Sequence, residues 1–349
     1  MYISVVNIEE NAGQVPVNYV LPPGVTRIID PGQSQITQLN EQAMSLKVTD
    51  LQSGDARAVY KNSGMDMRTY KRLQMFVHAE KLIDDKTNLR DGDVSVFLRL
   101  GSDSKSNYYE YEVPLSLTEP GNYSTYNAQD QEAVWPQSNM FDFPLSLFTD
   151  LKLERNAKKR MDNSTVTFQT RYSSYDPDKN QNKVTIVGNP SLSDVRTMMI
   201  GVRNNSNAAK DIVVWVNEMR LTDFDQSGGW AAKANVNLGL SDIATLNIAG
   251  HVETVGFGGI DHSLTERRLD DYYQYNIATM VELGRFLPEK VKLKAPLFYS
   301  ITEQRTSPKY NPLDQDNLLK DALDNAGSKA ERDSISDASI EKSTVESFS

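Results

Sequence analysis

Apolar and polar side chains alternate along much of the chain with a period of two, the pattern of β-strands that bury one face. The first clear stretch runs from Leu73 to Ala79. Clusters of Gly, Asn, Asp and Ser at 101–103 and 204–206 have the composition of turns. Further stretches with the same period lie at 94–100, 109–113, 166–172, 184–187, 198–202 and 212–221.

About seven such strands, joined by polar turns, predict a β-sandwich of the jelly-roll type over residues 60–224. The segment 144–160 interrupts them and has Lys158 and Lys159 in its last turn, so we expect a helix there. Pro16, Pro22 and Pro23 break the chain before the sandwich. We therefore expect residues 1–59 to form an irregular extended segment.

Residues 229–301 carry longer alternating segments. Each has about 10–12 residues, more than the ~5–6 of an ordinary strand and close to the ~9–11 that cross a bilayer when tilted. Their connections alternate between short and long, as in outer-membrane barrels, and on that rule the sandwich lies outside the cell. Periodicity alone is equally compatible with a soluble sheet. The four segments are 232–240, 244–252, 273–283 and 291–301.

In the membrane interpretation, one face of each strand contacts lipid and the other lines a hydrated lumen. Trp230, Phe257, Tyr273 and Tyr299 would form an aromatic girdle at the outer ends of the strands. The expected lipid-facing residues are Ala234, Val236, Leu238, Leu246, Ile248, Ile277, Val281, Leu293 and Leu297. The expected lumen-facing residues are Lys233, Asn235, Asn237, Asn247, Glu253, Asn276 and Lys292.

The two ends of the chain indicate an internal piece of a longer protein. The first six residues lack the basic and apolar regions of a signal peptide, which suggests either a cytosolic protein or an internal piece of a longer one. Four strands cannot close a barrel, which needs at least about eight, so we favour the internal piece. Residues 302–349 are polar and predict a loop insertion with a short helix at 314–326, ended by Gly327.

Composition removes several classes of function. The 349 residues carry a formal net charge of −10 and no cysteine. An acidic chain lacks the dense basic surface that nucleic-acid backbones require. Without cysteine there is no disulfide framework and no thiol nucleophile. No apolar run approaches the ~18 residues that would suggest a membrane helix.

Candidate sites for metals and catalysis are few. His78, His251 and His262 have no second ligand at metal-binding spacing. The segment 176–182 spaces oxygen atoms like half a calcium loop, but Val187 stands where the loop needs a glutamate, so we expect a polar hairpin turn. The chain has no phosphate loop, dinucleotide fingerprint or nucleophile elbow. We expect no enzyme, no cofactor and no metal.

Aromatic and acidic side chains alternate at 108–112. Tyr109 and Tyr111 could stack on a sugar ring while Glu110 and Glu112 accept hydroxyl hydrogens, although alternating aromatic residues on a strand are more often core residues. A surface glycan-binding module is therefore the alternative function. Glu110, Glu112 and Glu218 could also supply the carboxylate pair of a glycoside hydrolase, but the sequence does not set their separation.

One long segment carries a family resemblance. Residues 214–261, VWVNEMRLTDFDQSGGWAAKANVNLGLSDIATLNIAGHVETVGFGGID, resemble the hallmark segment of the SprA/Sov family. These are outer-membrane translocons of the type IX secretion system of Bacteroidetes, which also support gliding motility. The similarity extends to the segments NIEENAGQVPVNYVLPPG, NEQAMSL, MDMRTYKRLQMFVHAE, VFLRLGSDSKSNYYEYEVPL and SPKYNPLDQDNLL.

The resemblance implies a very large single-chain barrel with extracellular insertions, through which folded cargo leaves the cell. It implies three kinds of partner besides outer-membrane lipid: secreted cargo proteins, a smaller shuttle barrel and a plug protein. We therefore expect a mainly β chain, with a jelly-roll-like sandwich as an extracellular cap, followed by four antiparallel transmembrane strands of an incomplete large β-barrel. The chain would be a conduit in the outer membrane.

Overall fold

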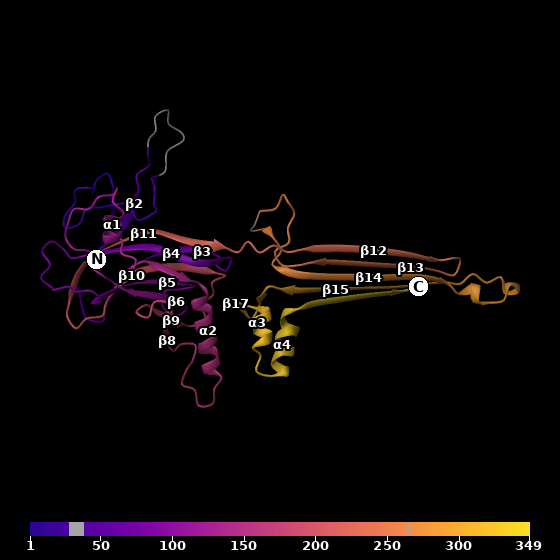
Figure 1. Cartoon of the computed structure of the whole chain (residues 1–349). Coiled ribbons are helices and arrows are strands. Elements are labelled where there is room, and N and C mark those ends of the chain that lie inside the picture. The colour runs from indigo at the N-terminus through magenta and orange to yellow at the C-terminus, as the bar shows by residue number, and fades with distance from the viewer. Residues whose placement is uncertain (28–37, 264–265) are drawn as a thin grey trace. The chain divides into compact units, whose positions relative to one another are not determined.

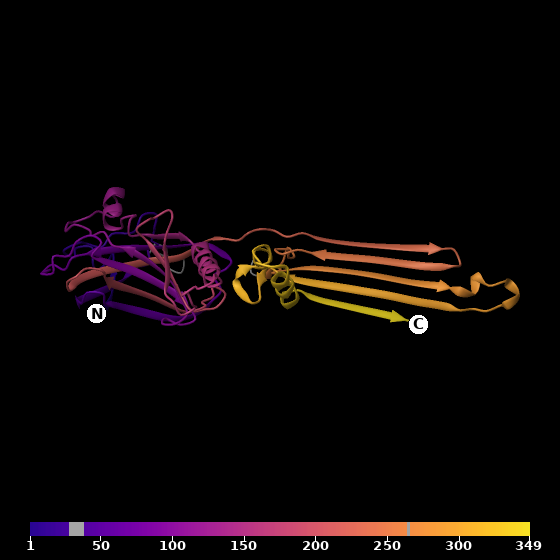
Figure 2. The same cartoon turned by 90° about the horizontal axis from the view of Figure 1, so that it is seen from below.

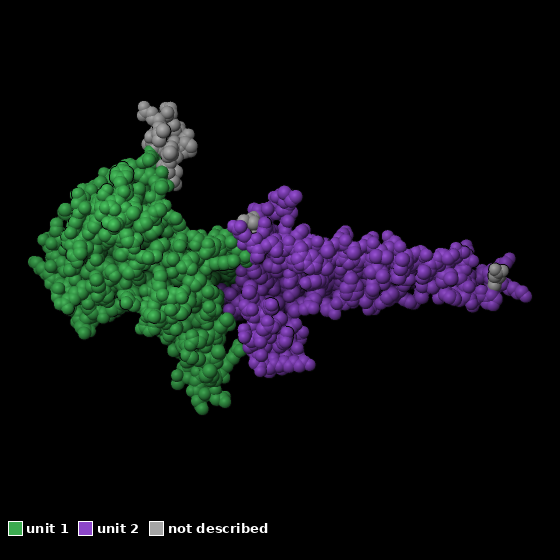
Figure 3. Space-filling model, viewed as in Figure 1, with its two compact units in different colours: residues 1–225 green, residues 226–349 purple. Residues whose placement is uncertain are grey.

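The computed structural model describes residues 1–27, 38–263 and 266–349, and it divides into two compact units, residues 1–225 and 226–349 (Figure 3). Antiparallel sheets dominate both units, which confirms the prediction of a mainly β chain. Within the described residues, no helix is both long and apolar enough to cross a membrane.

The first unit is a β-sandwich (Figure 1). One sheet has the order β1-β2-β11-β4-β7, and the other has the order β3-β10-β5-β6-β9-β8. The strands are β1 (Tyr2–Asn7), β2 (Gln42–Leu51), β3 (Ala56–Met65), β4 (Tyr70–Glu80), β5 (Val94–Gly101), β6 (Tyr108–Pro114), β7 (Phe141–Pro144), β8 (Tyr172–Tyr175), β9 (Lys183–Val187), β10 (Val195–Asn204) and β11 (Lys210–Phe224).

The order of the central strands is that of a jelly roll. The chain passes from β2 in the first sheet to β3 in the second, and returns through β10 and β11 beside them. Between these, β4 and β7 lie in the first sheet while β5 and β6 lie in the second. The pairs β2–β11 and β3–β10 thus join the beginning and the end of this winding in each sheet, as in a double-sheet Greek key. The hairpin of β8 and β9 extends the second sheet beyond β6.

The core lies between the two sheets because the alternating strands turn their apolar faces inward. Leu73, Met75, Val77 and Ala79 of β4 are all buried there, as the period of two predicts. Helix α2 (Ser146–Lys159) adds Phe148 and Leu151 to this core, in the segment where the sequence predicts a helix. A second cluster, formed around Trp135 and Trp215, covers the outer face of the first sheet.

Several sequence expectations for the first unit are wrong. Within 1–59, expected to be irregular, β1 and β2 are regular strands, β3 begins at Ala56, and β2 lies inside the first sheet. The part of that expectation covering 28–37 lies outside the described residues. Strand β2 was missed because polar residues lie on both sides of its short apolar segment, in which Met44, Leu46 and Val48 alternate with polar residues. Of the expected strand 166–172 only Tyr172 lies in a strand, β8, and the sequence did not indicate α1 (Ala128–Val134) or β7.

The second unit contains a sheet of order β12-β13-β14-β15-β18. Figures 1 and 2 show these long strands side by side in one layer, with α3 and α4 at one end of the sheet and residues 283–295 at the other. The elements are β12 (Ala231–Leu240), β13 (Ala244–Glu253), β14 (Asp270–Glu282), η2 (Leu283–Phe286), η3 (Glu289–Val291), β15 (Pro296–Pro308), β16 (Tyr310–Asn311), β17 (Asp314–Leu318), α3 (Leu319–Asp324), α4 (Lys329–Ser339) and β18 (Glu341–Phe348).

The end of the chain differs from the sequence expectation. The fourth long strand begins at Pro296 instead of residue 291 and continues to Pro308, so the connection before it is longer than expected. The expected helix 314–326 is strand β17 followed by the short α3. Residues 302–349 are therefore more than a loop insertion, because β18 pairs with β15 along Tyr299–Thr306.

Candidate functional site

The sheet of the second unit has one apolar face. Directly paired residues of antiparallel strands lie on the same face, so the register shows which side chains share it. The expected lipid-facing residues of β12–β15 fall together on this face. Read across β12, β13, β14 and β15, its rows are Leu240–Ala244–Val281–Leu297, Leu238–Leu246–Thr279–Tyr299, Val236–Ile248–Ile277–Ile301, Ala234–Gly250–Tyr275–Glu303 and Ala232–Val252–Tyr273–Arg305.

This apolar face is uncovered. Val236, Leu238 and Leu240 are 48%, 47% and 55% exposed. Among the described residues, no hydrophobic side chain of β12–β15 is buried. Figures 1 and 2 show the strands as a single layer, with α3 and α4 at one end and the short 3₁₀ helices η2 and η3 at the other. A contiguous exposed apolar surface of this kind marks a site of contact with lipid or with another protein.

The height of the apolar face matches a membrane. From the row of Leu240 to the row of Ala232 the strand rises about 27 Å at ~3.4 Å per residue. With a strand tilt of ~40°, this corresponds to about 21 Å along the membrane normal, close to the ~25 Å apolar band of outer-membrane barrels. On β12–β14 the length and the chemistry of this face therefore agree. On β15 the apolar surface is shorter, because the rows of Ala234 and Ala232 end there in Glu303 and Arg305.

The opposite face is polar. It carries the expected lumen-facing residues of β12–β14 and is rich in amides and hydroxyls. Asn237 lies opposite Asn247, and the Nδ2 of Asn276 donates to the Oγ1 of Thr302 at 2.7 Å. Four of its five rows are Asn237–Asn247–Ala278–Ser300, Asn235–Ala249–Asn276–Thr302, Lys233–His251–Gln274–Gln304 and Ala231–Glu253–Tyr272–Thr306. The fifth row, Gly239–Thr245–Met280–Phe298, is mixed.

An ionic cluster lies at the end of the polar face, next to the last residue of β13. The Nη1 of Arg268 lies 2.5 Å from Glu253 Oε2, and its Nε lies 2.9 Å from Asp270 Oδ1. The Nε2 of His251 lies 3.0 Å from Glu253 Oε1. Glu253, expected to face a lumen, therefore has partners within the chain and fixes the connection between β13 and β14.

Two of the expected wall residues lie outside the strands. Leu293 and Lys292 belong to the connection before β15, because that strand begins only at Pro296. Lys292 has a positive φ of 48°, which interrupts an extended strand. The alternation at 291–301 thus extended the expected strand into a loop, and neither residue has a place in the sheet.

The expected aromatic girdle is only partly in place. Tyr273 lies at the same end of the sheet as Trp230, whose backbone N–H donates to the hydroxyl of Thr254. Tyr299 is level with Leu238, toward the opposite end, because β15 starts later than expected. Tyr275 was not expected in the girdle, although it lies two residues from Tyr273 on the same face of β14.

Strand β18 carries little apolar surface. On the side shared with Ile301 and Tyr299 it presents Glu346 and Phe348, and Lys342 lies opposite Arg305. The apolar face therefore belongs to β12–β14 and to the part of β15 from Leu297 to Ile301. The polar composition of β18 explains why its sequence did not indicate a strand.

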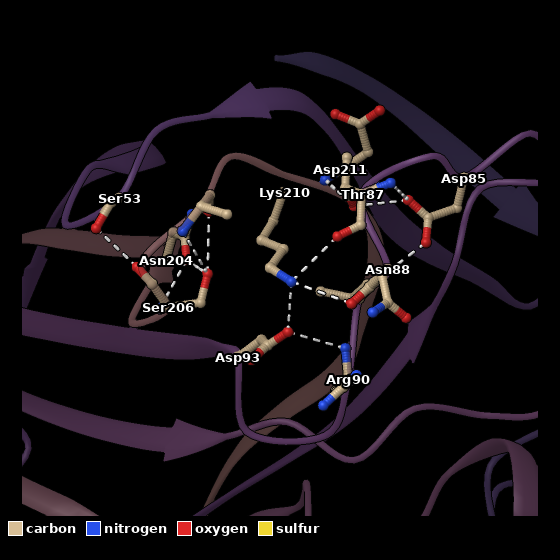
Figure 4. Close-up of polar contacts among 12 residues, drawn as sticks. Ser53, Asp85, Thr87, Asn88, Arg90, Asp93, Asn204, Ser206, Lys210 and Asp211 are labelled. Atoms are coloured by element: carbon tan, nitrogen blue, oxygen red, sulfur yellow. Dashed lines mark hydrogen bonds and ion pairs between the residues drawn. The ribbon is translucent and has the colours of Figure 1, made fainter.

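The first unit contains a dense polar cluster at one end of the sandwich (Figure 4). The Nζ of Lys210, at the start of β11, lies 2.6 Å from Asp93 Oδ2 and donates to the carbonyls of Thr87 and Asn88 at 3.2 and 3.1 Å. Burial raises the pKa of Asp85, but the Thr87 hydroxyl and two backbone N–H groups outweigh it and hold that pKa below its usual range. These contacts fasten the β4–β5 connection to β11.

The strand proposed to stack on sugar is buried. Tyr109 and Tyr111 are both 0% exposed and pack in the core, where Tyr111 stacks on Phe143 with ring centroids 3.9 Å apart. Glu110 is also buried, and its carboxylate pairs with Arg99 and Arg171 at 2.5 Å and with Arg203 at 3.0 Å. Burial alone would raise the pKa of Glu110, but the three arginines hold it below its usual range. The alternative of a sugar-stacking surface is thus wrong, and the interpretation of Tyr109 and Tyr111 as core residues is confirmed.

The remaining candidates also have structural partners. Asp176–Asn182 connects β8 and β9, as expected for a hairpin turn, and Asp176 Oδ2 accepts from the Tyr111 hydroxyl at 2.5 Å. His78 is fully buried and stacks on Trp215. Glu218 pairs with Arg220 at 2.7 Å. Within residues 1–27, 38–263 and 266–349, no group of three or more His, Cys, Asp or Glu could hold a metal ion.

A comparison with protein families gives one match, over residues 1–323, to the family SprA_N, described as motility related/secretion protein. The match covers the first unit and continues through β15 into α3. A search of curated proteins finds no match.

Proposed function

Because the chain belongs to the SprA_N family of motility-related and secretion proteins, we propose that β12–β15 form part of the wall of a protein-conducting channel in the outer membrane. The channel would be the type IX translocon, exporting folded cargo and supporting gliding motility. One observation carries this proposal: a single-layer sheet leaves a tall apolar face uncovered while its other face is polar. Lipid is a cover that fits the height of that face.

In this arrangement the apolar rows contact lipid, and the Asn, Gln and Thr rows line a hydrated passage. The ends at 241–243 and 283–295 would face the periplasm, and the first unit would lie outside the cell, as expected from the rule that outer loops are long. Closing a barrel takes at least about eight strands, so the wall requires further strands from outside residues 1–349. Cargo, a shuttle barrel and a plug are the proposed partners.

The alternative of a glycan-binding face at Tyr109 and Tyr111 loses its basis, because both rings are in the core. Both faces of β12–β15 also remain without a role in that alternative. A sheet exposed to water on an apolar face would expose a surface prone to aggregation.

Site-specific photo-crosslinking in cells tests the conduit directly. A benzophenone side chain replaces Asn276 in one variant and Ile277 in another, since these neighbours lie on opposite faces of β14. During secretion of a stalled fusion cargo, we expect cargo adducts from position 276 and lipid adducts from position 277. Cargo adducts at 277 and none at 276, or cargo adducts at neither position, would overturn the proposal.

A further inference from the structure

The outer face of the first unit's β1-β2-β11-β4-β7 sheet holds a pocket of about 330 Å³. Its floor crosses four strands through the row Tyr2–Lys47–Val213–Glu80, with Ser4 and Ser45 paired in the next row. Residues 11–16 and 81–84 form the walls. The pocket lies on the side of the sheet opposite to the sandwich core, and it is independent of the proposed membrane strands.

Glu80 is the unusual residue of this pocket. It is 1% exposed, and within the described residues its buried Oε2 has no hydrogen-bond partner. The Nε2 of His78 lies 3.8 Å from its Oε2, which is beyond hydrogen-bond distance. A buried carboxylate without a donor is destabilising, so a ligand that donates hydrogens to it would gain the whole of that interaction.

Two neighbours of Glu80 share this property. His78 Nε2 and Trp215 Nε1 are buried without a hydrogen-bond partner in the described chain. The two rings stack at a centroid distance of 3.9 Å and come from paired positions of β4 and β11. Buried polar groups without partners are few in native proteins, and here three are adjacent in the sheet.

The other residues that line the pocket favour a neutral ligand over an ion. Lys47 and Lys81 balance Glu80 and Asp84, so neither a cation nor an anion gains from the net charge of the pocket. Ser4, Ser45, Asn11 and Gln14 supply hydroxyls and amides, which both donate and accept. Apolar contact surface stands at the rim, where Tyr2, Val15 and Ile83 are each 67% exposed.

We propose that this pocket binds a neutral saccharide. Sugar hydroxyls would donate to the Glu80 carboxylate and accept from Lys47, while the C–H face of the ring lies on Tyr2 or on the aliphatic rim. A hydroxyl is the group that can satisfy an acceptor and a donor of the pocket at once. The volume of the pocket is at the small end for ligand sites, which fits one or two sugar rings.

Saturation-transfer NMR on the full chain tests this proposal. The probes are glucose, galactose, mannose and N-acetylglucosamine at up to ~100 mM. The ion n-butylammonium is tested in parallel as a mimic of a cationic side chain. We expect millimolar binding of at least one sugar. Glu80→Gln should weaken it at least tenfold. Lys47→Met, which changes an exposed side chain and should leave folding intact, should weaken it several-fold, while the matched control Lys61→Met on β3 should not.

Three outcomes would overturn the proposal. The first is that none of the four sugars gives a signal. The second is that the signal persists unchanged in both Glu80→Gln and Lys47→Met. The third is that n-butylammonium binds more tightly than every sugar. The last outcome would assign the pocket to a cationic side chain of a protein partner. Melting curves of each variant show whether a lost signal comes from lost folding.

Discussion

Val236 of β12 lies directly opposite Ile248 of β13, and yet the two side chains are 48% and 38% exposed. On the other side of the same strands, Asn237 lies opposite Asn247. A cross-strand aliphatic pair stabilises a sheet chiefly when something covers it. One face of this single layer of backbone is thus apolar and the other is polar, as in a wall between lipid and water.

Charge on the apolar face should be costly. Val236→Arg places a guanidinium in the middle row of the band, where a membrane-facing arginine costs ~2–4 kcal/mol. We expect the protein to be depleted from isolated outer membranes, as measured by fractionation and quantitative immunoblotting. Asn237→Arg is the matched control on the polar face and should leave abundance unchanged. Equal tolerance of both substitutions would contradict the lipid-facing assignment.

The contacts of Lys210 with Asp93 and with the carbonyls of Thr87 and Asn88 should hold the β4–β5 connection in place. Lys210→Met removes the ammonium and leaves Asp93 and two carbonyls without it, which should cost ~2–3 kcal/mol because the site is largely buried. Hydrogen exchange should rise at 85–93, and the unfolding midpoint should fall. Lys105→Met, in an exposed turn, is the control. Unchanged exchange at 85–93 would show that the cluster is not what fixes this connection.

Tyr111 should act as a core residue. Tyr111→Phe keeps the stacking on Phe143 but removes the hydroxyl that donates to Asp176 and accepts from Asn182, for a loss of ~1–2 kcal/mol. Phe143→Ala removes a buried ring and should cost ~3–5 kcal/mol. Chemical denaturation monitored by tryptophan fluorescence gives both values. If Phe143→Ala were neutral, the core assignment of this aromatic pair would be wrong.

Acid should weaken the first unit through Asp103. Burial opposes ionisation, but the N–H groups of Ser106, Lys105 and Asn107 and the Asn107 side chain outweigh it and lower the pKa of Asp103 to about 2. A lowered folded-state pKa gives stability that is complete above the unfolded value of ~3.9 and is lost as the pH falls toward 2. We expect a loss of ~1–2 kcal/mol from this group over that interval.

Asp103→Asn isolates this contribution, since the ion pairs of Glu110 also weaken in acid. The variant should be less stable than the parent at pH 6, and the difference should shrink toward zero by pH 2. Denaturant titrations at each pH measure the difference. A constant difference across the range would mean that ionisation of Asp103 does not stabilise the turn.

Period and turn chemistry were enough to predict strands that bury a regular apolar face. The stretch from Leu73 to Ala79 became β4, and the face shared by Val236, Ile248 and Ile277 followed from alternation alone. Strand β18 could not be predicted, since backbone pairing with β15 forms it with little apolar content. The start of β15 was missed because alternation at 291–295 continues through a loop.

The candidate sites divided in the same way. Tyr109 and Tyr111 had a pattern that fits either a core or a sugar platform, and only the packing of the two sheets decides between them. The Glu80 pocket had no sequence signal, because β1, β2, β4 and β11 come together there from distant parts of the chain.

Spin-label accessibility at positions 235–238 in native outer membranes tests the central claim most directly. The 349 residues contain no cysteine, so each introduced cysteine in this chain is a unique label site. We expect labels at 236 and 238 to be accessible to oxygen and shielded from a water-soluble nickel chelate, and labels at 235 and 237 to show the reverse. Equal access of the nickel chelate to all four positions would contradict a membrane-spanning β12.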